Sequence, residues 1–102
     1  MTDFVLVHGA WHGSWCWARV RQLLAAGRHV VFTPTLTGLG ERSHLLSRDV
    51  GLNTHVADVA NLMVWEDLHD VVLVGHSYAG VVVRHVADRM PDRIRSLIYL
   101  DA

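Results

Sequence analysis

The sequence is short of several residue types, and each shortage excludes a class of chemistry or location. Its 102 residues contain no lysine, so all nine basic residues are arginines and Schiff-base catalysis, which needs a side-chain amine, is excluded. The single cysteine, Cys16, cannot form an internal disulfide, which fits a reducing compartment. No basic segment precedes the apolar run at 4–7, and that run is too short for a signal peptide or a membrane span. We therefore expect a cytoplasmic protein without a membrane partner.

Charge and length narrow the function classes further. Nine basic and ten acidic residues give a formal net charge of −1, and no basic block could follow a phosphate backbone, so we expect no nucleic-acid partner. Hydrophobic residues make up 51% of the chain, which excludes intrinsic disorder. That fraction is high for a small domain, which leaves a large share of its surface in water. Residues 1–102 are long enough for one domain and too short for two.

Four short apolar runs predict β-strands. They lie at residues 4–7, 30–32, 71–74 and 94–100. The third run is apolar without alternation, which is typical of a central strand covered on both faces. By chain order, the sheet should run second, first, third, fourth, and this order leaves the last strand on an open edge.

Helical patterns fill the gaps between these strands. The first should begin at Ser14 as N-cap and end at Gly27, the second should be capped by Asn53 or Thr54, and the third should run from about 78 to 90. Alternating strands and helices predict an α/β fold with a doubly wound parallel sheet. The long irregular stretch 33–52 is interpreted as a functional or partly ordered loop.

The strongest functional motif is Gly75-His76-Ser77-Tyr78-Ala79-Gly80, directly between a predicted strand and a predicted helix. A serine hydroxyl is a poor nucleophile, but a tight strand-to-helix turn exposes its oxygen and aims the next backbone N–H at a developing oxyanion. The strict pattern G-x-S-x-G is not met, because Ala79 stands at the fifth position. The alternative is that Ser77 only caps the third helix.

A second motif follows the first strand: His8-Gly9-Ala10-Trp11-His12-Gly13-Ser14-Trp15-Cys16-Trp17. Ligands of open parallel sheets bind at the carboxyl ends of the strands, and a His-Gly-small loop there can supply a second oxyanion N–H, which we assign to Ala10. Trp11 is the best candidate of the three tryptophans for lining a substrate pocket, although tryptophans beside a helix start are about as often core.

Residues 4–17 and 72–78 together resemble the N-terminal part of an α/β-hydrolase, in the esterase and hydroxynitrile-lyase branch that includes the plant methylesterases. The resemblance covers essentially the whole chain and implies four strands, three helices, Ser77 as nucleophile, and the N–H groups of Ala10 and Tyr78 as the oxyanion hole. It implies no metal and no organic cofactor. Lyase members typically depart from the His-Gly-Ala and Gly-His-Ser forms, so we expect a carboxylic ester hydrolase acting on a small-molecule ester, with a hydroxynitrile lyase as the alternative.

The rest of a catalytic triad is not evident. In this fold the acid and the base follow the serine in the chain. Here the last histidine, His85, lies on the helix after the serine and cannot turn back, whereas Asp101 ends the fourth strand, where a minority of family members carry the acid. We therefore expect a partial domain, truncated before its acid and base and nearly inactive alone. The alternatives are a ligand-binding fragment without turnover and an interaction module that self-associates through 94–100.

The remaining histidines do not indicate a metal site. His8 and His12 have helical spacing, but the adjacent glycines indicate a loop, and no acidic pair or second cysteine completes a zinc set. His76 is expected to orient the serine loop rather than act as a base. The other histidines are expected on the solvated surface: His29, His44, His55 and His69.

Overall fold

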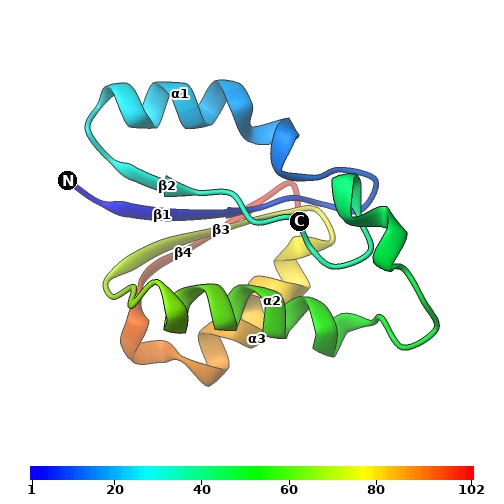
Figure 1. Cartoon of the computed structure of the whole chain (residues 1–102). Coiled ribbons are helices and arrows are strands. Elements are labelled where there is room, and N and C mark those ends of the chain that lie inside the picture. The colour runs from blue at the N-terminus through cyan, green and yellow to red at the C-terminus, as the bar shows by residue number, and fades with distance from the viewer.

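The computed structural model describes all 102 residues and contains one four-stranded parallel sheet (Figure 1). The strands are β1 (Asp3–Val7), β2 (Val30–Phe32), β3 (Val71–His76) and β4 (Ile94–Leu100). Their order is β2-β1-β3-β4, so the predicted order is confirmed and β4 forms one edge. All three pairings are parallel, which brings the carboxyl ends of the strands to the same edge of the sheet.

The helices cover both faces of the sheet. Figure 1 shows α1 (Ala18–Ala26) on one face, and α2 (Leu52–Trp65) with α3 (Ala79–Arg89) on the other. Three short 3₁₀ turns complete the chain: η1 (Ser14–Trp17), η2 (Gly40–Leu45) and η3 (Pro91–Arg93). None of these helices is both long and apolar enough to cross a lipid bilayer.

The hydrophobic core has two parts, one on each side of the sheet. The larger part lies between the sheet and the pair α2 and α3, and includes Val5, Val7, Leu73, Val59 and Val83, all without solvent exposure. The smaller part lies beneath η1 and α1 and consists of Leu6, Trp17 and Val74. Residues on both faces of β3 are therefore buried, as the uninterrupted apolar run at 71–74 predicted.

The first helix starts differently from the prediction. The expectation that Ser14 caps it is wrong, because Gly13 precedes the 3₁₀ turn η1 and the α-helix begins only at Ala18. The hydroxyl of Ser14 instead forms a 2.7 Å hydrogen bond with the hydroxyl of Thr33 on the following loop. Gly27 does end α1, as predicted, and the left-handed backbone that reverses the chain falls on Arg28 (φ 66°).

The second helix also has a different N-cap. Gly51 occupies this position, and its backbone N–H donates to the Thr54 hydroxyl at 3.1 Å. Neither Asn53 nor Thr54 is therefore the N-cap. The stretch 33–52, which was predicted to be irregular, is anchored in the protein interior, since its residue Leu36 is fully buried.

A close approach of strand and helix backbones at Gly75 joins β3 to α3. A Cβ atom at Gly75 would lie 2.6 Å from Val83 Cγ2 and 2.7 Å from the Ala79 carbonyl oxygen. Both distances are shorter than real Cβ contacts, and the carbonyl belongs to backbone that cannot move independently. Glycine at this position lets α3 begin directly against the end of β3.

We predict that Gly75→Ala lowers the free energy of unfolding by about 2–3 kcal/mol, because overpacking against fixed backbone strains the core. Gly51→Ala is the matched control, since a Cβ at Gly51 meets no atom within 4 Å and alanine at an N-cap costs about 0.5–1 kcal/mol. Urea unfolding followed by circular dichroism measures both. Equal unfolding midpoints for the two variants would contradict the close packing.

Candidate active site

The chain makes a two-residue turn, Ser77 and Tyr78, between the end of β3 and the start of α3. Ser77 adopts a left-handed backbone conformation (φ 54°), which costs a non-glycine residue about 1–3 kcal/mol. Its N–H donates to the Leu100 carbonyl at the end of β4 (3.1 Å), and its carbonyl accepts from the Gly80 N–H (2.9 Å). The side chain is exposed, and no side-chain hydrogen bond caps α3. Backbone hydrogen bonds therefore hold Ser77 in place, and its side chain does not cap α3.

The loop after β1 packs directly against this turn. Val7 at the end of β1 is in register with Gly75 of β3, so the segments that follow the two strands lie side by side. A Cβ atom at Gly9 would lie 3.1 Å from Ser77 Cβ and 3.1 Å from the His76 carbonyl oxygen. Glycine at this position thus brings the backbone next to Ser77, and Ala10 follows immediately.

Two backbone donors near Ser77 have no partner within the chain. Among the backbone hydrogen bonds outside helices and strands, none uses the N–H of Ala10 or Tyr78 as its donor. Unpaired backbone N–H groups beside an exposed serine are what an oxyanion hole requires, because negative charge on a reacting carbonyl oxygen needs preorganised donors.

His8 fixes the loop that carries Ala10. Its side chain is fully buried, with Nδ1 2.7 Å from the Gly9 carbonyl oxygen and Nε2 accepting the Leu36 N–H at 3.0 Å. A carbonyl can only accept, so the proton sits on Nδ1 and the ring is neutral. Burial lowers the pKa of His8, which favours the same neutral form. This side chain therefore joins the loop after β1 to the loop after β2.

The predicted substrate-contacting residue Trp11 follows Ala10 in a left-handed conformation (φ 68°) and is 93% exposed. It lines neither of the two cavities of the chain. Trp17, by contrast, belongs to the core beneath α1, and its buried indole N–H has no hydrogen-bond partner. Trp17 is thus a core residue, as the alternative predicted, and it also lines the cavity on the α1 side.

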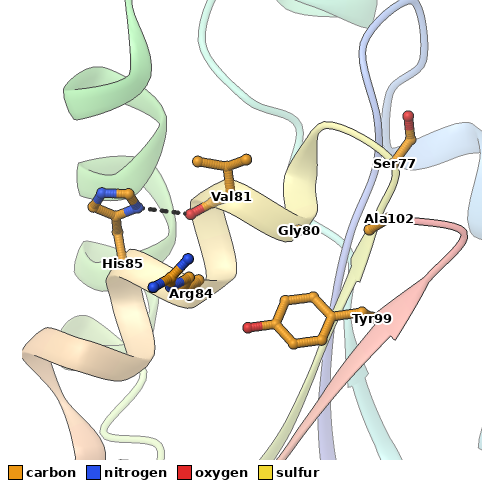
Figure 2. A pocket seen from close by; sticks show the side chains of 7 residues that line it. All are labelled: Ser77, Gly80, Val81, Arg84, His85, Tyr99 and Ala102. Atoms are coloured by element: carbon orange, nitrogen blue, oxygen red, sulfur yellow. Dashed lines mark hydrogen bonds between the residues drawn. The ribbon is translucent and has the colours of Figure 1, made fainter.

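A cavity of about 450 Å³ lies between α3 and the end of β4, beside Ser77 (Figure 2). Figure 2 shows Ser77 and His85 at opposite ends of it, with the serine hydroxyl directed away from the imidazole. His85 Nδ1 is 2.8 Å from the Val81 carbonyl oxygen, one helical turn earlier. His85 is thus placed, as expected, where it does not contact the serine.

A second cavity of about 270 Å³ lies on the α1 side and is lined in part by His12, Cys16 and His76. The His76 ring packs edge-on against the rings of His12 and Trp17. The orienting role expected for His76 stays a prediction. Burial raises the pKa of the Cys16 thiol, so it stays protonated and is a weak nucleophile.

The residue that the sequence interpretation missed is His55. The expectation that it lies on the solvated surface is wrong, because it is only 7% exposed on the inner side of α2. Its Nδ1 is 2.8 Å from the Tyr78 hydroxyl and its Nε2 is 2.9 Å from the Thr37 carbonyl oxygen. Both ring nitrogens form hydrogen bonds, and these bonds offset the free-energy cost of burying the imidazole. In the sequence, His55 lies one, four and eight residues before Val56, Val59 and Met63. This spacing is typical of one face of a helix and could have predicted that His55 is buried.

Asp101 directly follows β4, is exposed and has a left-handed backbone (φ 50°). No three His, Cys, Asp or Glu side chains are grouped closely enough to hold a metal ion.

Comparisons with known proteins agree with this geometry. The model of the alpha/beta hydrolase family matches residues 4–102. The chain is 54% identical over its full length to a carbendazim hydrolyzing esterase from Nocardioides sp. (strain SG-4G), of which it covers 42%. It is 35% identical to methylesterase 2 of Arabidopsis thaliana, with 97% of this chain and 38% of that protein covered.

Solved structures show the same relationship. An extracellular alpha/beta-hydrolase from a Paenibacillus species superposes with a TM-score of 0.91 at 31% identity, over 100% of this chain and 41% of that one. The chain therefore spans about two fifths of the length of the relatives that it matches.

We predict that folding stability falls as the pH drops below about 6.5, the ordinary pKa of histidine. The pKa of His8 is lowered in the folded state, so the unfolded chain binds the proton first and the stabilisation, complete above pH 6.5, is lost as the pH falls toward the folded pKa. One such group contributes a slope of at most about 1.4 kcal/mol per pH unit.

Urea unfolding between pH 5 and 8 measures this slope. His8→Gln, which keeps an acceptor for the Leu36 N–H and does not titrate, should flatten it. His44→Gln, at an exposed histidine, should not. Identical slopes for the wild type and His8→Gln would contradict the prediction.

Proposed function

Because the chain belongs to the alpha/beta hydrolase family, we propose that it carries the nucleophile and oxyanion hole of a serine esterase that cleaves small carboxylic esters. The observation that carries the proposal is the strained, exposed Ser77 beside the unpaired N–H groups of Ala10 and Tyr78. Relatives named as esterases, at 54% and 35% identity, support the ester class.

The reaction would proceed in two steps through a covalent intermediate. The Ser77 oxygen attacks the ester carbonyl carbon while a general base takes its proton, and the resulting oxyanion accepts hydrogen bonds from the Ala10 and Tyr78 N–H groups. Collapse breaks the bond to the alcohol oxygen, which leaves with that proton, and forms acyl-Ser77. Water then attacks the acyl carbon, releases the carboxylic acid and restores the serine.

The general base and its acidic partner would come from outside these 102 residues. His85 points away from Ser77, while both nitrogens of His8 and of His55 are already paired. The relatives extend well beyond the matched region, since this chain covers about two fifths of each. The 102-residue chain alone should therefore be nearly inactive, because the oxyanion hole and binding supply only residual catalysis.

We propose that Trp11 contacts the substrate. Its exposed indole adjoins Ala10, so it would contact an acyl or aromatic group of an ester whose carbonyl oxygen occupies the oxyanion hole. Neither a metal nor an organic cofactor takes part in these steps. The N–H groups of Ala10 and Tyr78 supply the charge stabilisation.

We predict that Ser77→Ala in the product of the complete reading frame lowers kcat for p-nitrophenyl acetate by about 10³-fold or more and abolishes labelling by a fluorophosphonate. Ser96→Ala is the matched control, because Ser96 is an exposed serine on β4. Steady-state kinetics and mass spectrometry of the labelled peptide measure the two effects. Labelling that persists in Ser77→Ala would exclude Ser77 as the nucleophile.

We also propose that the open edge of β4 pairs with another strand. This edge is uncovered, and Ile98, Tyr99 and Leu100 near its end are all more than two-fifths exposed. Unpaired strand edges with apolar side chains recruit further strands.

For the 102-residue chain alone, the predicted partner is a second copy, so sedimentation velocity should show a dimer that Ile98→Lys shifts toward monomer. A charged side chain at an edge disfavours pairing. Leu23→Lys, at an exposed position on α1, is the control. A monomer at all concentrations would contradict this proposal.

A further inference from the structure

A chain of hydrogen bonds connects α2 to the turn that carries Ser77. Both carboxylate oxygens of Asp58 accept from Thr37, one from its N–H (2.6 Å) and one from its hydroxyl (2.7 Å). The Thr37 carbonyl oxygen is 2.9 Å from His55 Nε2, and His55 Nδ1 is 2.8 Å from the Tyr78 hydroxyl. Asp58 and His55 lie one turn apart on α2, so the segment at Thr37 is clamped twice by the same helix.

The direction of each bond follows from the groups involved. The Thr37 carbonyl can only accept, so His55 Nε2 must carry the proton and donate. In a neutral imidazole the other nitrogen is then an acceptor, and the Tyr78 hydroxyl donates to Nδ1. Burial raises the pKa of the Tyr78 phenol, which keeps that donor protonated. The network is thus fully paired with one defined tautomer.

We infer that His55 is a positioning residue for the oxyanion hole: by accepting the Tyr78 hydroxyl, it fixes the residue whose backbone N–H faces the reacting carbonyl. The inference rests on the proposed serine esterase activity. Tyr78 is the last residue before α3, and no side chain caps that helix, so the hydroxyl–imidazole bond is the side-chain tether of the turn. The rings also pack edge to face, with centroids 5.7 Å apart.

This tether matters because an oxyanion donor acts only when it is aimed correctly. Removing such a donor costs about 10²–10³-fold in kcat, and misdirecting it costs part of that. Tyr78 shares its turn with a strained Ser77, so without the tether the turn can relax in a way that moves the Tyr78 N–H. The loss should fall on kcat and on the affinity for transition-state analogues, with little change in KM.

Two substitutions at His55 separate its two hydrogen bonds. Asn places an amide oxygen near the position of Nδ1, so His55→Asn can still accept the Tyr78 hydroxyl. Gln places an amide nitrogen near the position of Nε2, so His55→Gln can still donate to Thr37 but does not present the Tyr78 acceptor. Tyr78→Phe removes the same bond from the other side.

The experiment uses the product of the complete reading frame, with p-nitrophenyl acetate as substrate and a trifluoromethyl ketone as transition-state analogue. We expect Tyr78→Phe and His55→Gln to lower kcat and analogue affinity by about tenfold, with KM changed less than about twofold. His55→Asn should recover most of the loss. The double variant Tyr78→Phe/His55→Gln should be no worse than either single variant, because both remove one interaction. His69→Gln, an exposed histidine, is the control.

Several outcomes would overturn the inference. Unchanged kcat in Tyr78→Phe and His55→Gln, with Ser77→Ala inactive, would refute the positioning role and leave the esterase proposal intact. Full activity in Ser77→Ala would refute the esterase proposal instead. Should a His55 variant fail to fold, nitrogen-15 spectra of the wild-type ring still test the network, since a proton on Nδ1 would refute it.

Discussion

The close packing of β3 against the first turns of α3 is the constraint on which the site depends. At Gly75 the two backbones approach until even a methyl group is excluded by Ala79 and Val83. Only two residues are left to reverse the chain, so Ser77 takes a left-handed conformation that its own side chain does not favour. The N–H of Tyr78 is free because Tyr78 is the N-cap of α3, where backbone donors have no intrahelical partner. Van der Waals contact between β3 and α3 therefore sets the backbone geometry of the site.

Buried histidines then hold the loops around the turn. His8 connects the loop after β1 to Leu36, and His55 connects Tyr78 to Thr37, so both reach adjacent residues of the same segment. Each ring uses one nitrogen as donor and one as acceptor, which no aliphatic side chain could do and which offsets the cost of burial. The loop after β1, the segment at Leu36 and Thr37, and the turn at Tyr78 are thereby fixed relative to one another by two buried rings.

Much of the fold could be predicted because it is encoded locally. Four apolar runs give the strands, and the strand order follows from chain order and right-handed crossovers. The candidate nucleophile Ser77 could be predicted from the sequence because the glycine and alanine residues around it indicate close packing of the backbone. His55 was missed because a lone histidine looks polar by type, and its partner Thr37 lies in a segment without periodicity. Ser14 was misplaced for a related reason, since its hydroxyl finds Thr33, nineteen residues later, in preference to its own helix.

The hydrogen bond from the Ser77 N–H to the Leu100 carbonyl ties the serine to a strand made twenty-three residues later. During synthesis, the turn at Ser77 leaves the ribosome well before β4 is available to receive that bond. Pairing between β3 and β4 is parallel and joins residues at least 23 positions apart. Completion of the serine's surroundings is thus coupled to closure of the sheet at β4. A chain in which β4 has not yet paired would therefore lack the hydrogen bond that holds the Ser77 backbone.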